Sequence, residues 1–224
     1  MTVQAMTEWV AFGSFAVALS VAVVAMTRRS ARLLDRLDVS PVALLANTAG
    51  TQVVLGVVLA GGAGLASVPL SAVQPGLSAE AAAVGAGAGL AISLGNAALV
   101  RVFDRAGVGY DESLREALTP ETPRGWAFLF LVALPVVAGF EELLFRGVLV
   151  GALATGFGVS PWLLAVGASV LFGAAHTAQG SVGVAVTALL GVALAAVFLA
   201  TDSLLAAAVA HYVVNAVEFG VHAR

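Results

Sequence analysis

Residues 126–151 read WAFLFLVALPVVAGFEELLFRGVLVG, a run in which only Glu141, Glu142 and Arg146 are charged. An α-helix needs about 20 apolar residues to cross about 30 Å of hydrocarbon, so this run is long enough to span a membrane. A transmembrane β-strand would alternate polar and apolar side chains, and this run does not. The run therefore predicts a membrane-spanning helix with ionisable groups in its interior.

The rest of the chain is also strongly apolar. Of its 224 residues, 60% are hydrophobic and only 10% are charged, which is too few charges for the surface of a soluble globule. Further apolar runs predict helical spans at 8–26, 41–61, 80–100, 161–179, 183–200 and 203–221. The predicted fold class is all-α, a polytopic transmembrane helix bundle of about seven spans, with six or eight as the alternatives.

Charge and cysteine content exclude several functions. The basic residues are all arginine, and the net charge of −3 provides no basic stripe for nucleic acid. The chain has no cysteine, which excludes disulfides, thiolate metal sites and cysteine nucleophiles.

Arginine residues predict the orientation in the cell membrane. They concentrate after the first span, from Arg28 to Arg36, and after the third, from Arg101 to Arg124, whereas the loop 62–79 between the second and third spans has no charge. By the positive-inside rule both arginine-rich loops are cytoplasmic. The N-terminus is then outside and the C-terminus is cytoplasmic. The polar segment 101–124 is interpreted as a solvated connector, with substrate docking as the alternative.

The charged residues of the fourth span are the first functional candidates. An ionisable group inside a membrane costs about 2.5 kcal/mol or more, so each must face the bundle or a water-filled cavity. Glu142 and Arg146 are four residues apart on one helix face, the spacing of an ion pair, and the pair is interpreted as structural. Glu141 points about 100° away and is free to face a cavity.

Two further spans add polar groups. His176 follows Phe172 by four residues, and Asn215 follows His211 by four, so each pair shares a helix face. A lone buried histidine is usually structural, but two histidines, an asparagine and two glutamates converging from three helices predict a functional site. Glu218 is interpreted as reaching toward the membrane interface rather than lining this cavity.

These residues form three ordered motifs: EExxxR at Glu141–Arg146, FxxxH at Phe172–His176 and HxxxN at His211–Asn215. In this order on successive helices they resemble the CAAX protease and bacteriocin-processing family of intramembrane endopeptidases, which includes Ras-converting-type CAAX prenyl proteases. The resemblance covers about residues 124–220. It implies hydrolysis of a peptide bond, with Glu141 activating water, His176 assisting, and His211 and Asn215 stabilising the oxyanion. Glu142, Arg146 and Phe172 would support this site.

The resemblance leaves the cofactor open between none and one divalent metal. Glu141, His176 and His211 would be the ligands of a Zn²⁺ ion with an open fourth position, although the HExxH helix of classical zinc proteases is absent. The predicted helix positions also leave a gap of several Å in depth between His176 and the pair Glu141 and His211, at about 1.5 Å per residue.

We divide the chain into N-terminal spans with the connector, residues 1–125, and a catalytic helix bundle, residues 126–224, within one integral membrane domain. The expected partners are the lipid bilayer and a membrane protein or peptide substrate. The principal alternative function is a transporter or proton-relay protein, for which buried Glu and His residues are equally expected. A catalytically idle membrane chaperone built on the same scaffold is a third interpretation.

Overall fold

The computed structural model describes residues 2–34, 39–105, 107 and 113–222, and within these ranges it contains helices and no strand. Six of the described helices are long and apolar enough to cross a membrane. The predicted all-α, multi-pass fold of about seven spans is confirmed.

The first part of the chain forms three long helices, which are α1 (Val3–Leu34), α2 (Pro41–Leu65) and α3 (Ala79–Arg105). α2 begins at Pro41, because a proline at the first helical position lacks only an N–H that would have no intrahelical partner. The preceding residue, Ser40, caps the helix by accepting a hydrogen bond from the Ala43 N–H.

A short helix, α4 (Ser113–Leu118), leads to a long one over Pro123–Phe157. The long helix consists of α5 (Pro123–Phe128), η2 (Leu129–Ala133), α6 (Leu134–Glu142), η3 (Leu143–Ala152) and α7 (Leu153–Phe157), of which η2 and η3 are π-helical. π-Helical turns are rare and frequently occur at functional sites. They lie on both sides of α6, which ends with Glu141 and Glu142.

The remaining helices are α8 (Pro161–Ala175), the 3₁₀ turn η4 (Thr177–Gln179), α9 (Gly180–Thr201) and α10 (Leu204–His222). α8 has 15 residues, about 22 Å, which is less than the hydrocarbon thickness. The predicted fifth span, 161–179, was therefore too long at its C-terminal end. Residues 176–179 are His-Thr-Ala-Gln, and the backbone leaves the helix at His176 (φ −105°, ψ 30°).

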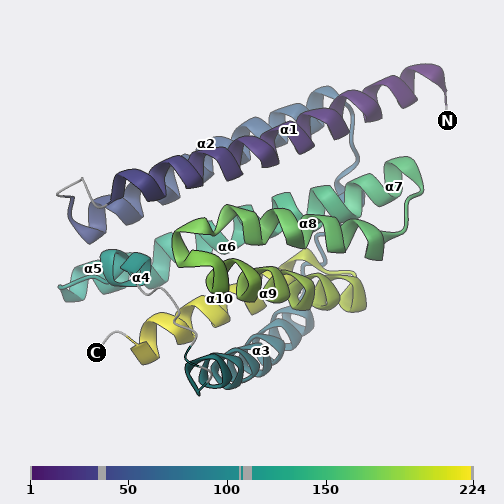
Figure 1. The fold of residues 1–224 in the computed structure, drawn as a ribbon. Coiled ribbons are helices and arrows are strands. Elements are labelled where there is room, and N and C mark those ends of the chain that lie inside the picture. Colours follow the sequence, from purple (N-terminus) through teal and green to yellow (C-terminus); the bar gives the residue numbers. More distant parts are fainter. Residues whose placement is uncertain (1, 35–38, 106, 108–112, 223–224) are drawn as a thin grey trace.

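The helices are arranged in layers (Figure 1). α1 and α2 lie side by side along one side of the bundle, α3 lies on the opposite side, and the helices from α6 to α10 fill the space between them. α10 contacts α3, α6 and α9, whereas α2 packs on α6. The N- and C-termini are at opposite ends of the bundle.

Close packing of α3 on α10 depends on glycine. A Cβ at Gly85 would collide with the backbone oxygen of Ala206, and one at Gly89 would lie 2.7 Å from the backbone oxygen of Ala210. Small residues four positions apart, such as Gly85 and Gly89, let helix backbones approach closely in a membrane.

The loop between α2 and α3 holds the start of α10. The N–H groups of Leu204 and Leu205 donate to the carbonyl oxygens of Gln74 and Pro75, at 2.7 and 3.2 Å, and the Ser203 hydroxyl donates to the Gly76 carbonyl at 2.9 Å. The first N–H groups of a helix have no intrahelical acceptor, so this loop completes the N-terminus of the helix that carries His211.

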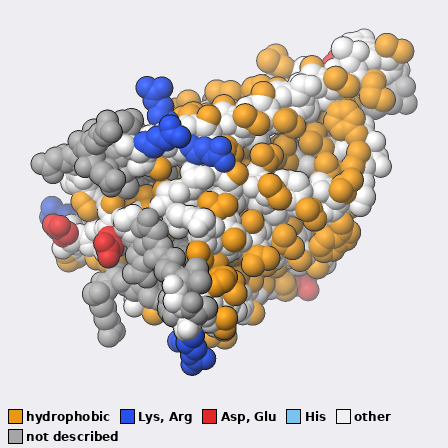
Figure 2. Space-filling model, viewed as in Figure 1, with side chains coloured by type: hydrophobic (Ala, Val, Ile, Leu, Met, Phe, Trp, Pro, Cys, Tyr) orange, Lys and Arg blue, Asp and Glu red, His pale blue; other side chains and the backbone are white. Residues whose placement is uncertain are grey.

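The surface suits a lipid environment. Hydrophobic side chains are spread over much of the face in Figure 2, and the arginine side chains lie in its left half. Large apolar residues of α2 and α8, such as Val57, Leu163 and Val170, are more than half exposed. The buried core is formed by the aromatic residues Phe12, Phe145, Phe172 and Phe198 with smaller apolar side chains.

Candidate active site

The EExxxR motif forms a buried ion pair. Arg146 Nη1 donates to Glu142 Oε1 at 2.7 Å, and the two side chains are 1% and 0% exposed. Arg146 Nη2 donates to the Gly191 carbonyl of α9 at 2.9 Å, and the guanidinium carbon lies 4.6 Å from the centre of the Phe172 ring. The pair predicted from the i, i+4 spacing is present, and it links three helices. A buried charge is tolerated only when it is paired and hydrogen-bonded in this way.

His211 completes this network from α10. Its Nδ1 lies 2.8 Å from Glu142 Oε1, so the imidazole donates to a carboxylate that Arg146 already neutralises. This hydrogen bond places the proton on Nδ1 and turns Nε2 toward Glu141, whose Oε2 is 3.7 Å away. One carboxylate therefore orients the histidine toward the other.

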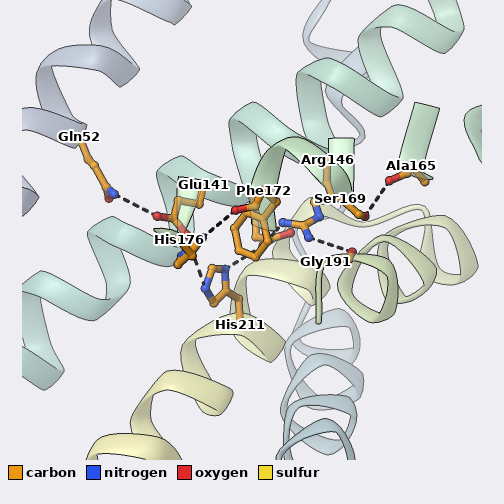
Figure 3. Close-up of polar contacts among 10 residues, drawn as sticks. Gln52, Glu141, Arg146, Ala165, Ser169, Phe172, His176, Gly191 and His211 are labelled. Carbon is orange, nitrogen blue, oxygen red and sulfur yellow. Dashed lines mark hydrogen bonds and ion pairs between the residues drawn. The ribbon is translucent and has the colours of Figure 1, made fainter. Parts of the chain in front are cut away.

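Glu141 differs from Glu142 in its surroundings. Its side chain is 14% exposed, and its Oε1 accepts one hydrogen bond, from Gln52 Nε2 on α2 at 3.2 Å. Its Oε2 is buried and has no hydrogen-bond partner among the described residues. Figure 3 shows Glu141 between Gln52 on one side and His211 on the other. Glu141 thus offers one oxygen atom to a water molecule or substrate.

Phe172 connects the two histidines. Its ring centre is 4.7 Å from that of His176 and 5.7 Å from that of His211. The depth gap expected between the histidines is therefore bridged by one buried ring (Figure 3). The early end of α8 explains the difference, because His176 lies at the tip of a short helix rather than within a full span.

The tautomer of His176 follows from its backbone contact. Nδ1 lies 2.8 Å from the Phe172 carbonyl oxygen, which can only accept, so Nδ1 carries a hydrogen. In the neutral ring, Nε2 then keeps its lone pair. His176 is half-buried and can accept a proton at this position.

Asn215 lies one helical turn after His211 and is half-buried. Among the described residues its amide has no hydrogen-bond partner, so the structure does not link it directly to the other predicted site residues. Its role stays a prediction.

Two other polar residues are separate from the site. Glu218 forms an ion pair with Arg115 of α4 at 2.6 Å, so the connector packs against the end of α10. The buried Ser169 hydroxyl donates to the Ala165 carbonyl at 2.7 Å, as expected for a structural serine (Figure 3).

The alternative of a metal bound by Glu141, His176 and His211 stays a prediction. In the part of the chain that the structure describes, no group of three His, Cys, Asp or Glu side chains is arranged to hold an ion. The Nδ1 atoms of His176 and His211 both contact protein oxygen atoms, which leaves only Nε2 on each ring. A histidine that ligates a metal through Nε2 usually donates its other ring N–H to a protein oxygen atom, so both rings keep a nitrogen that can bind an ion. The mechanism proposed for the chain uses no metal.

Sequence reasoning missed Gln52 and the Gly191 carbonyl. Gln52 gave a signal, because it is a polar amide inside the apolar run 41–61 and such residues are rare in membrane helices. The Gly191 carbonyl gave no such signal in the sequence, since every residue has a backbone carbonyl.

Residues 123–217 match the family model described as type II CAAX prenyl endopeptidase Rce1-like. The matched segment contains all three motifs and confirms the predicted resemblance to CAAX proteases, while α1 to α3 lie outside it. No curated protein and no solved structure matches the chain. The family match gives no support to the transporter interpretation.

Proposed function

We propose that the chain hydrolyses a peptide bond of a membrane-associated or lipidated substrate, with Glu141 activating the water. Residues 123–217 match the Rce1-like CAAX prenyl endopeptidase model, which supports this class of reaction. The observation that carries this mechanism is the contrast between two adjacent carboxylates. Glu142 is fully buried, and its Oε1 is held by both Arg146 and His211. Glu141 has no cation on it and is partly exposed, and its unpartnered Oε2 lies 3.7 Å from His211 Nε2.

In the first step, a water molecule bound to Glu141 Oε2 transfers a proton to that oxygen. The water oxygen forms a bond to the scissile carbonyl carbon, and the carbonyl π electrons move to oxygen. A positioned carboxylate suits this general-base role, which contributes about 10²–10⁴-fold.

The resulting oxyanion needs hydrogen-bond donors. The Asn215 amide can supply one, and His211 can supply another from Nε2 when both of its ring nitrogens carry a hydrogen, because Nδ1 donates to Glu142. Such donors are most effective where water is excluded, as in this buried site.

In the second step, the intermediate collapses, the C–N bond breaks, and the leaving nitrogen takes a proton. Glu141 returns the proton that it accepted, and His176 Nε2 assists the transfer. The products are a carboxylic acid and an amine. Phe172 holds both imidazole rings in place by contact with each.

The test is cleavage of fluorogenic membrane peptides, prenylated and unprenylated, by purified protein. Glu141→Gln keeps the shape but removes the basic lone pair, so turnover should fall by about 10²–10⁴-fold while the protein stays folded. Glu218→Gln is the matched control, because Glu218 pairs with Arg115 away from the site, and it should retain activity. Near-wild-type turnover by Glu141→Gln would refute the base assignment.

The same panel tests the metal alternative. Activity that survives a chelator supports the glutamate mechanism. Loss of activity with chelator, restored by Zn²⁺, would instead make Glu141, His176 and His211 ligands.

The proposed orientation has the N-terminus outside and the C-terminus in the cytoplasm. It is supported by the placement of the termini at opposite ends of the bundle, with α4 and α5 at the C-terminal end (Figure 1). Because the chain has no cysteine, single cysteines at Ser30 and Ser113 should be labelled only from the cytoplasm, and one at Ser71 only from outside. Labelling of all three from one side would contradict this orientation.

A further inference from the structure

α2 approaches the end of α6 at a glycine. Gly56 has no side chain, and a Cβ there would lie 3.6 Å from the Phe140 ring, so the two helices are close at this point. Gln52 is one turn earlier on the same face of α2, and Glu141 directly follows Phe140. This approach brings an amide from the N-terminal spans to the free carboxylate.

The contact of Gln52 determines how Glu141 is oriented. The terminal torsion of a glutamate side chain is broad, with no sharp staggered minimum, so the position of its oxygens depends on their partners. Gln52 Nε2 donates to Oε1 at 3.2 Å, and no other hydrogen bond to Glu141 comes from the described residues. With Oε1 held by the amide, Oε2 is the oxygen that faces His211.

We propose that Gln52 is a positioning residue, which holds the Glu141 carboxylate so that Oε2 meets the water. α2, which lies outside the segment matched by the family model, is then part of the active site. This inference rests on the proposed role of Glu141 as the base.

A purely structural role explains Gln52 less well. Its Oε1 is buried and has no partner among the described residues, which is unfavourable for folding by itself. A leucine of similar size would avoid burying this amide. The presence of an amide at this position is therefore explained by the hydrogen bond that its Nε2 donates to the Glu141 carboxylate.

The experiment compares Gln52→Leu with Asn47→Leu. Asn47 is on the same helix but exposed, so the control makes the same change from amide to hydrocarbon away from the site. Gln52→Leu should lower kcat by about 10- to 100-fold, the worth of a hydrogen bond to a charged group, with KM and the unfolding temperature nearly unchanged. Asn47→Leu should leave kcat unchanged. Wild-type kcat for Gln52→Leu would overturn the inference, as would a loss of kcat that follows a loss of folded protein.

A double-mutant cycle separates this inference from the mechanism that it depends on. If Gln52 acts through Glu141, adding Gln52→Leu to Glu141→Gln should cause little further loss, because residues that act as a unit are not additive. The full 10- to 100-fold loss in both backgrounds would show that Gln52 acts independently and would overturn the inference. Wild-type turnover by Glu141→Gln alone would instead refute the proposed function.

Discussion

α3 and α2 both pack on the bundle that carries the site, but they do so in different ways. α3 meets α10 backbone to backbone, because Gly85 and Gly89 leave no room for a side chain. α2 meets α6 less closely, since a Cβ at Gly56 would make an ordinary contact, and it adds one polar contact through Gln52. The α3 interface fixes the backbone on which His211 lies, whereas the α2 interface fixes a single side chain. Substitutions at α3 should therefore lower stability, and substitutions at α2 should lower activity.

The largest effect is expected from Arg146→Ala, which removes the side chain that links Glu142, α8 and α9 in the bundle on which α2 and α3 pack. The change leaves Glu142 buried without its cation and should cost about 3–5 kcal/mol of unfolding free energy, measured by thermal unfolding in detergent, and should also lower activity. Arg115→Ala is the control, because its pair with Glu218 is partly exposed and should be worth about 1 kcal/mol or less. If Arg146→Ala is inactive but as stable as wild type, Arg146 takes part in the reaction rather than in stabilising the helix bundle.

A smaller effect is expected at the α3–α10 interface. Gly85→Leu should destabilise the protein by about 1–3 kcal/mol, because the added side chain meets backbone that cannot move aside. A Cβ at Gly87, two residues away on α3, has no neighbour within 4 Å, so Gly87→Leu should change the unfolding temperature little. Equal effects of the two substitutions would show that the close approach does not contribute to stability.

The smallest effect on stability is expected at the α2–α6 interface. Gly56→Ala should be tolerated, since its Cβ has ordinary contact distance. Gly56→Leu should move α2 away from Phe140 and lower kcat by about 10-fold through the lost Gln52 contact, with stability changed by less than about 1 kcal/mol. Gly50→Leu, on the same helix in open space, is the control. A Gly56→Leu protein that is fully active would show that α2 does not position Glu141.

The sequence was sufficient for features that depend on local periodicity. Apolar length predicted the long helices, and the i, i+4 spacing predicted the pair of Glu142 and Arg146. It was insufficient where the outcome depends on tertiary contacts. The predicted fifth span ran on through His176, Thr177 and Gln179, although α8 ends at Ala175. Polar residues also occur inside membrane helices where they face the bundle, so their presence alone did not reveal the helix end.

The candidate site was partly predictable for the same reason. The motifs predicted Glu141, His176 and His211 as site residues, but spacing within one helix could not reveal that α2 brings Gln52 to Glu141. Nor could it show that Phe172 contacts both histidines, since that depends on how α8 and α10 are placed relative to each other.

The loop that completes the start of α10 also bears on the order of assembly during synthesis. Ser203 bonds to Gly76 across 127 positions of sequence, so α2 and α3 enter the membrane long before the partner of their connecting loop has been made. A Cβ at position 76 would collide with Ser203, and the φ of 52° at Gly76 favours glycine. A substitution of Gly76 should therefore be poorly tolerated. The site is then complete only when α10 inserts, which keeps His211 away from Glu141 until α10 has been translated.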